Sequence, residues 1–467
     1  MNLTDRRGNP VSTTSRAALE LHEAAVDLFH GYYGDPLGAN QAALQEDKDF
    51  VMGHCFAAGL MLSTTERAFL PEARKAIEAG EARMAEANER ERMHLTALRA
   101  WLDGDVEHAL WRYGVLLEHY PRDSFGLQMA HLGDFFVGSS RMLRDRVARV
   151  LPHWDRNVTG YGFVLGMHAF GLEEMGEYAL AEEQGRAALD LNARDPWAIH
   201  AVAHVMEMQG RAWEGVRWLE SRADDWAPDN GFAFHNWWHL ALYYLDIGDE
   251  RKVLELYDQG VRPGDSRVVL ELVDATALLW RLMLRGVDVG NRWKPVADAW
   301  EPLAQDGHYA FNDMHAMAAF VAADRPAAAA ALLRAQTARI ERGGTNAMMT
   351  WTVGIPVCRA LQAFGRGDWE MCVDLLAPTR FVAHRFGGSH AQRDLLAQTL
   401  LEAALRGGIH GAAEELAHAR LRDKPSSGLN WRFATRAWGI GPDDAVSLPG
   451  KALPAAANPA ELASARG

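Results

Sequence analysis

Apolar residues recur every three to four positions through most of the chain, which is the period of an amphipathic helix. The first such run, residues 15–34, spaces Leu21, Ala25 and Phe29 four residues apart and ends at a Gly-Asp-Pro turn. Further helical runs are expected within residues 50–62, 70–87, 266–286, 294–307, 309–343, 352–381 and 389–425. We find no period-two alternation of the kind that predicts a strand. The pattern therefore predicts an all-α protein.

Between these outer segments, glycines punctuate the helical pattern at regular intervals. They are Gly104, Gly138, Gly176, Gly210 and Gly248; each is followed by an amphipathic run, and all but Gly210 by an acidic or small residue. Their spacings are 34, 38, 34 and 38 residues. One glycine turn is a weak signal, but five in near-register are a strong one. A period near 34 residues is typical of tetratricopeptide repeats, each of which is a helix-turn-helix unit.

The sequence thus predicts a tetratricopeptide-repeat-like α-solenoid, a right-handed superhelix of antiparallel helix pairs. Residues 1–15 are polar and are expected to form a flexible N-terminal arm. Residues 16–436 are expected to form a single solenoid domain of about a dozen helix pairs or fewer. Residues 437–467 are rich in Ala and Pro and are predicted to be a disordered tail.

The repeat register predicts which side chains face the concave side, where such solenoids bind their ligands. We set each turn glycine at position 15 of its repeat and take positions 2, 5, 9, 12 and 13 as inward, the rule of tetratricopeptide repeats. The residues predicted to face or border the groove are Trp197, His200, His204, Glu207, His235, Trp238 and Glu173, with His239 at its margin. The sequence therefore predicts imidazoles, carboxylates and indoles on one wall.

Two histidine pairs carry most of the chemistry of this wall. His200 and His204 lie one helical turn apart, as do His235 and His239, and Glu207 follows His204 by three residues. Such pairs can chelate a divalent metal ion, which makes all four histidines metal-ligand candidates. Alternatively, His200, His204 and Glu207 form a catalytic acid–base group. The histidines can also be ordinary core groups that hydrogen-bond to neighbours.

Two later segments add polar residues to the candidate ligand-binding set. Residues 311–319 contribute Asn312, Asp313 and His315. Residues 389–394 contribute Gln392, Arg393 and Asp394, among which Arg393 could pair with a carboxylate in a bidentate manner. The plainer interpretations are a helix-start role for Asp313 and an internal clamp between Arg393 and Asp394. The tryptophans are more often core residues than ligand-stacking ones.

Composition narrows the classes of partner. The net charge of −14 argues against a phosphate backbone as a partner, so we expect no nucleic acid. Cys55, Cys358 and Cys372 are widely separated and indicate a reducing compartment without disulfides. No apolar run is long enough to cross a bilayer, and no secretory signal is apparent, so we expect a cytoplasmic protein without a membrane partner. A homodimer is considered, because solenoid ends can pair isologously.

The chain contains no phosphate loop, GxSxG elbow, HExxH motif or Rossmann glycine pattern. No nucleotide cofactor is therefore predicted, and a divalent metal is the one cofactor for which we find candidate ligands.

Several motifs together resemble one family. The stretches HAVAHVMEMQG, FHNWWHLALYYLDIGD, FNDMHAMAA, VGIPVCRAL and GGSHAQRD are similar to the tetratricopeptide repeat protein 38 family, in an order that spans residues 47–420. The resemblance implies a soluble, cytoplasmic helical-repeat protein. It implies the motif residues His200, His204, Glu207, His235, His239, Asn312, Asp313, His315, Gln392, Arg393 and Asp394, but it supplies no reaction.

Three hypotheses about function follow. The leading one is a concave groove whose His-, Glu- and Arg-rich pocket binds a small polar molecule or a peptide. The alternative is a hydrolase or lyase that uses this pocket with a bound metal or a His/Glu acid–base pair. The third is a protein-interaction scaffold.

Overall fold

The predicted helices run almost without interruption through the computed structural model, which describes residues 3–440. The first ten are α1 (Arg16–Gly31), α2 (Pro36–Glu46), α3 (Val51–Ser63), α4 (Leu70–Glu81), α5 (Glu89–Leu102), α6 (Val106–His119), α7 (Ser124–Phe136), α8 (Ser140–Val150), α9 (Tyr161–Glu174) and α10 (Tyr178–Leu191). The next seven are α11 (Pro196–Met208), α12 (Ala212–Glu220), α13 (Ala223–Trp226), α14 (Ala233–Ile247), α15 (Glu250–Leu256), α16 (Val269–Leu284) and α17 (Trp293–Trp300).

The remaining helices complete the chain as far as the structure describes it. They are α18 (Ala310–Ala322), α19 (Pro326–Glu341), α20 (Thr345–Met349), α21 (Ile355–Gly365), α22 (Trp369–Thr379), α23 (His390–Arg406), α24 (His410–Asp423) and α25 (Gly428–Ala437). Short 3₁₀ or π turns are η1 (Arg67–Phe69), η2 (Leu151–His153), η3 (Tyr257–Val261), η4 (Gly290–Arg292), η5 (Glu301–Leu303), η6 (Thr350–Gly354) and η7 (Ala383–Phe386). Over residues 3–440 no strand occurs beyond two isolated β-bridges.

The glycine turns explain why these helices pair. All five predicted turn glycines have positive φ, from 67° at Gly138 to 97° at Gly248. A side chain at such a position clashes with its own backbone, so glycine is the residue that reverses the chain here at low cost. The prediction of an all-α, tetratricopeptide-repeat-like solenoid is confirmed. Among the described residues, no helix is both long and apolar enough to cross a bilayer.

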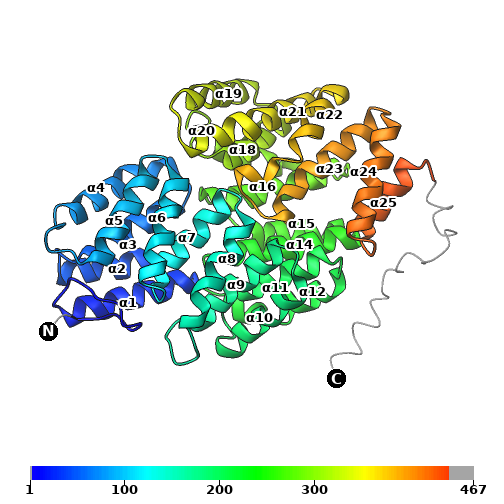
Figure 1. The fold of residues 1–467 in the computed structure, drawn as a ribbon. Helices are drawn as coiled ribbons and strands as arrows, with labels where there is room; N and C mark the ends of the chain where they lie inside the picture. The colour runs from blue at the N-terminus through cyan, green and yellow to red at the C-terminus, as the bar shows by residue number, and fades with distance from the viewer. Residues whose placement is uncertain (1–2, 441–467) are drawn as a thin grey trace.

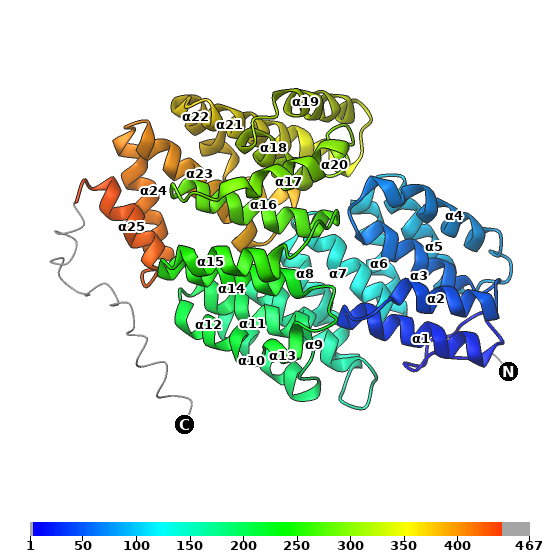
Figure 2. The same ribbon diagram turned by 180° about the vertical axis from the view of Figure 1, so that it is seen from behind.

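The helix pairs stack into a coil that turns back on itself. The N-terminal helices α1–α7 form one end of the molecule, and α16–α23 lie above the layer of α8–α15 in both ribbon views (Figures 1 and 2). Helix α23 packs against both α16 and α11. The first helices of successive pairs consequently surround one interior.

Hydrogen bonds between distant segments close this coil. The backbone N–H of Gly231 donates to the carbonyl oxygen of Tyr32 at 2.7 Å, and that of Thr345 donates to Gly104 at 3.0 Å. The hydroxyl of Tyr309 donates to the carbonyl oxygen of Phe136 at 2.9 Å. These contacts join helix pairs that are 170 or more residues apart, so the interior is enclosed by the early repeats as well as the late ones.

The N-terminal segment differs from the flexible arm that its polar composition suggested. Asp5 and Arg7 are buried: Arg7 donates to both carboxylate oxygens of Glu23, at 2.8 and 2.9 Å, and Arg90 contacts Asp5 at 3.2 Å. Polarity misled the prediction here because the polar residues find buried partners of opposite charge. At the other end, α25 ends at Ala437, and the predicted disordered tail lies outside the described residues from 441 onward.

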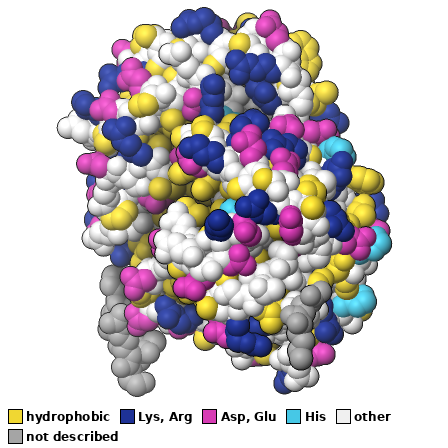
Figure 3. Space-filling view, turned by 90° about the vertical axis from the view of Figure 1, so that its left-hand side faces the viewer, with side chains coloured by type: hydrophobic (Ala, Val, Ile, Leu, Met, Phe, Trp, Pro, Cys, Tyr) yellow, Lys and Arg dark blue, Asp and Glu magenta, His cyan; other side chains and the backbone are white. Residues whose placement is uncertain are grey.

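The surface mixes charges of both signs. On the face shown in Figure 3, Lys and Arg side chains alternate with Asp and Glu, and hydrophobic side chains lie in a hollow near the middle of the view.

Candidate metal centre

Helix α11 sets the position of the first histidine pair. Asp195 caps the helix, because its Oδ1 accepts from the backbone N–H groups of Trp197 at 3.0 Å and Ala198 at 3.1 Å, and Pro196 occupies the first turn. His200 and His204 then lie one turn apart on the same face, with ring centroids separated by 4.4 Å. Both side chains are buried.

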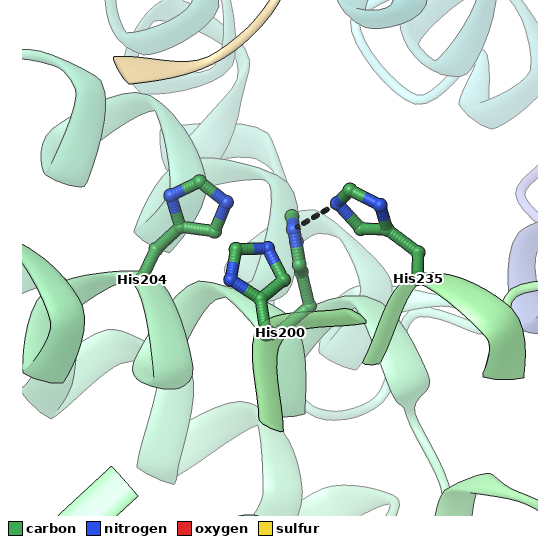
Figure 4. A group of neighbouring side chains, drawn as sticks. His200, His204 and His235 are labelled. Atoms are coloured by element: carbon green, nitrogen blue, oxygen red, sulfur yellow. Dashed lines mark hydrogen bonds between the residues drawn. The ribbon is translucent and has the colours of Figure 1, made fainter. Parts of the chain in front are cut away.

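Helix α14 brings the second pair against the first. The Nε2 atoms of His200 and His235 are 3.1 Å apart, and the ring centroids of His204 and His239 are 4.4 Å apart. Figure 4 shows His200 and His204 of α11 and His235 of α14 turned toward one another. One nitrogen from each of the four rings lies within 4.8 Å of the others, which is the arrangement of a potential metal-binding group.

Carboxyl groups lie beside the outer nitrogens of three rings, and two of these nitrogens, those of His235 and His239, form a hydrogen bond there. Oδ2 of Asp274 in α16 lies 2.6 Å from Nδ1 of His235, and Oε2 of Glu207 lies 3.0 Å from Nδ1 of His239. His204 Nδ1 lies 3.3 Å from Oε2 of Glu173 in α9. An imidazole whose Nδ1–H is donated to a carboxylate presents its Nε2 lone pair on the opposite side. Nε2 of His204 and of His239 is buried and has no hydrogen-bond partner.

Burial keeps three of the rings, those of His200, His204 and His239, neutral. Burial lowers the pKa of His204 to about 4, and burial together with the neighbouring imidazoles lowers the pKa of His200 and of His239 well below the usual value. A neutral imidazole has a free lone pair, which is the form that binds a metal ion.

A pair of glutamates adjoins the cluster. Glu173 is fully buried, neither of its carboxylate oxygens has a hydrogen-bond partner, and burial beside Glu174 raises its pKa well above the usual value. Glu174 is buried as well, which by itself raises its pKa, but the charges of His390 and Arg393 outweigh this and lower it. With His204, the two glutamates form a second group of potential metal ligands. Two adjacent carboxyls are thus held in different protonation states.

A cavity of about 300 Å³ that is partly open to solvent adjoins the histidines. His200, His204 and His235 line one part of it, and the remainder is mostly aromatic and aliphatic. Aromatic lining residues include Tyr32, Phe135, Phe170, Trp197, Phe232 and Phe311. Phe170 and Trp197 are 5.0 Å apart between ring centroids, and Phe232 is 5.1 Å from His200, so the rings continue directly into the cluster.

The structure brings some of the predicted ligand-binding residues to this cavity. Trp197, His200, His204, His235, Asn312 and Gln392 line it. Glu207, His239 and Glu173 lie behind the lining, in contact with its histidines or with one another. The predicted imidazoles and carboxylates therefore meet in one place.

Trp238 corrects the predicted register of α14. It is fully buried and does not line the cavity. Its ring stacks on His235 with 5.3 Å between ring centroids, and the Arg281 guanidinium also lies 5.3 Å from its ring centroid. His239, expected at the margin, is instead part of the cluster. Gly248 directly caps α14, whereas Gly210 follows the end of α11 by two residues, so aligning the glycines shifts the helix register. A shift of one residue rotates a helical position by about 100°.

Four more candidates lie away from the cavity. Asp313 accepts from the Gln336 amide at 3.2 Å, and His315 Nδ1 bonds the carbonyl oxygen of Phe311 at 2.8 Å. The other two form ion pairs. Arg393 contacts Glu174 at 3.5 Å, and Asp394 accepts from Arg420 at 3.1 Å rather than from Arg393. The internal clamp between Arg393 and Asp394 that we considered therefore does not form, because each of the two pairs with a different residue.

Sequence reasoning did not assign two parts of the site. Asp274 was recognisable as a charged residue in an apolar helix that needs a buried partner, but nothing in the sequence named His235 as that partner. Tyr32 and Phe232 reach the cavity because the α1–α2 turn meets the segment before α14, where Asn230 donates to the carbonyl oxygen of Gly31 at 3.1 Å. A contact across about 200 residues leaves no periodic signal.

Comparisons with known proteins give the architecture only. No family model matches the chain. Two solved structures that resemble it are those of the human IFIT1 dimer with m7Gppp-AAAA and of the human IFIT1 dimer with PPP-AAAA. The first has 13% sequence identity and a TM-score of 0.40, and the match covers 90% of this chain and 94% of that one. The second has 11% identity and a TM-score of 0.36, over 91% of this chain and 95% of that one.

One prediction requires correction on this point. The net charge led us to exclude a nucleic-acid partner, whereas both matched structures contain an oligonucleotide. A charge of −14 summed over the whole chain does not describe the potential at any single surface or cavity. It therefore does not exclude this class of partner, and the exclusion is withdrawn.

Proposed function

We propose that this helical-repeat protein binds a first-row transition-metal ion through Nε2 of His200, His204, His235 and His239. The observation that carries the proposal is the orientation of the rings: His235 and His239 have a carboxylate at the outer Nδ1, 2.6 and 3.0 Å away, and Nε2 of His204 and of His239 is buried without a hydrogen-bond partner. Carboxylate–histidine–metal triads in metalloproteins have this form, since the carboxylate fixes the tautomer and the ring orientation.

The spacing also fits a metal ion. Two nitrogens bound to tetrahedral zinc at about 2.0–2.1 Å lie about 3.3–3.4 Å apart. The observed 3.1 Å between the Nε2 atoms of His200 and His235 is within a few tenths of an ångström of that value. An all-imidazole ligand set suits zinc, copper, iron or nickel. Asp274 and Glu207 would offset the charge of the ion.

The adjoining cavity supports a role for the metal in small-molecule binding. Three of the four histidines line that cavity, so a ligand there would approach the ion as a fifth ligand, or in place of one histidine, because four histidines fill a tetrahedral site. The same observation favours the alternative of a metal-dependent hydrolase or lyase, in which the protonated Glu173 beside His204 could supply a proton. The resemblance to the tetratricopeptide repeat protein 38 family remains a prediction and adds no reaction.

Metal content tests the proposal. Full-length protein purified without a histidine tag should contain, or take up from added Zn²⁺, about one metal ion per chain as measured by elemental mass spectrometry. His204→Gln and His239→Gln should each lose most of it. The matched control is His131→Gln, which removes an equally buried imidazole outside the cluster.

Two outcomes would count against the metal. One is wild-type protein that neither contains nor takes up zinc, copper, iron or nickel. The other is a His131→Gln variant that loses as much metal as His204→Gln, because metal loss would then follow from general destabilisation.

A further inference from the structure

The cavity beside the histidines indicates the chemical class of its ligand. We infer that it binds an uncharged, mainly aromatic small molecule of one or two rings. This inference deepens the proposed function, since it concerns the ligand of the same site. It departs from the polar ligand that the sequence predicted.

The lining supports an apolar ligand. Rings from α7, α9, α11, α14 and α18 line it, together with Leu60, Leu132, Leu270 and Val273. Burying apolar ligand surface against such a wall is favourable by about 25 cal/mol per Å². Aromatic lining residues also offer edges and faces on which a planar ligand can pack in offset or edge-to-face geometry.

Charge argues against an ionic ligand. Among the described residues that line the cavity, none is Lys or Arg. An anion such as a phosphate ester would therefore lose its hydration without gaining a cationic side chain. The one carboxylate in the lining, Asp274, already contacts His235 at 2.6 Å. A cationic ligand would thus find no free carboxylate, although the aromatic faces could attract it.

The volume limits the size of the ligand. An apolar protein cavity of about 150 Å³ can hold one benzene molecule. On that scale, this cavity of about 300 Å³ accommodates one or two fused rings with a small substituent. A peptide or an intact nucleotide would exceed it without a rearrangement of the walls.

Three probes with the same ring system separate these cases: 2-naphthol, 2-naphthoate and 2-naphthylmethylammonium. Isothermal titration with the full-length protein, without added metal, should show 2-naphthol binding at least tenfold more tightly than either charged probe. Leu132→Trp should weaken 2-naphthol binding at least tenfold, because the indole fills the cavity. Leu180→Trp, which places the same side chain on the partly exposed outer helix α10, should leave binding unchanged.

The outcomes distinguish the ligand from the metal. Equal or tighter binding of naphthoate or of the ammonium probe overturns the inference, as does the absence of 2-naphthol binding to folded protein. If Leu132→Trp melts more than a few degrees below wild type, Phe135→Trp serves as a second cavity-filling variant. Zinc uptake without 2-naphthol binding removes only the ligand class, and 2-naphthol binding without metal uptake removes only the metal.

Discussion

Asp274 illustrates how one buried charge orients a functional group. It lies in the apolar helix α16, is 1% exposed, and has its carboxylate 2.6 Å from His235 Nδ1. A buried carboxylate without a partner would be costly, so the pair forms as a unit. The pairing directs Nε2 of His235 toward His200 and away from α16.

Removal of this carboxylate should weaken metal binding without removing a ligand. We expect Asp274→Asn to reduce the affinity for Zn²⁺ by about 10- to 100-fold, the usual effect of losing such a partner of a ligating histidine. Competition against a chelator of known affinity measures the change. Asp313→Asn, at another buried aspartate that is not part of the histidine cluster, is the control and should retain wild-type affinity. Unchanged affinity in Asp274→Asn would contradict the assigned role.

Asp313 should also make stability depend on pH. Burial raises its pKa from 3.8 to about 7, although Gln336 donates to it. An acid whose folded-state pKa is raised contributes stability at low pH that is lost as the pH rises from about 4 through about 7. Relative to wild type, Asp313→Asn should therefore gain about 2–3 kcal/mol of unfolding free energy between pH 5 and pH 8. Urea unfolding at both pH values measures this, and a constant difference would refute it.

At the scale of helices, the turn glycines show which features of the fold the sequence predicts and which it does not. Their spacing predicts the pairing of helices and the inward side of α11, on which Trp197, His200 and His204 line the cavity as expected. It fails by about one residue in α14, because Gly248 and Gly210 occupy different cap positions. Sequence spacing identifies a turn, but the cap geometry that fixes the rotation of the helix appears only in three dimensions.

Two turn glycines with the same role in the repeat should respond differently to a methyl group. Both have positive φ, but a Cβ at Gly138 would lie 1.6 Å from the carbonyl oxygen of His384, whereas at Gly176 nothing lies within 4 Å. Gly176→Ala should therefore cost about 1–2 kcal/mol, the price of the left-handed conformation alone. Gly138→Ala should cost several kcal/mol more, because η7 must move. Thermal or urea unfolding of the two variants tests this, and equal losses would contradict the close approach.

For the whole molecule, the cavity is the feature that sequence could not predict. Its histidines come from neighbouring repeats, so the 34- to 38-residue period places them together. Other lining residues are Tyr32 of the turn after α1, Tyr309 just before α18 and Phe311 in α18. These residues meet only because the coil closes, and closure depends on small rotations accumulated over many helix pairs. The sequence thus predicted a polar groove, whereas the structure forms a mainly apolar, aromatic cavity that is partly open to solvent.

Closure has a consequence for how such a chain can change. Open arrays can gain or lose units, since each unit contacts only its neighbours. Here an extra helix pair inserted between α7 and α18 would carry the hydroxyl of Tyr309 away from Phe136 and separate Thr345 from Gly104. These two contacts between early and late helix pairs would then be lost, and Phe136 and Tyr309 would no longer meet at the wall of the cavity. Duplication of a helix pair is the simplest way to lengthen a repeat protein. Between α7 and α18 of this chain, such a duplication would break the contacts that close the coil.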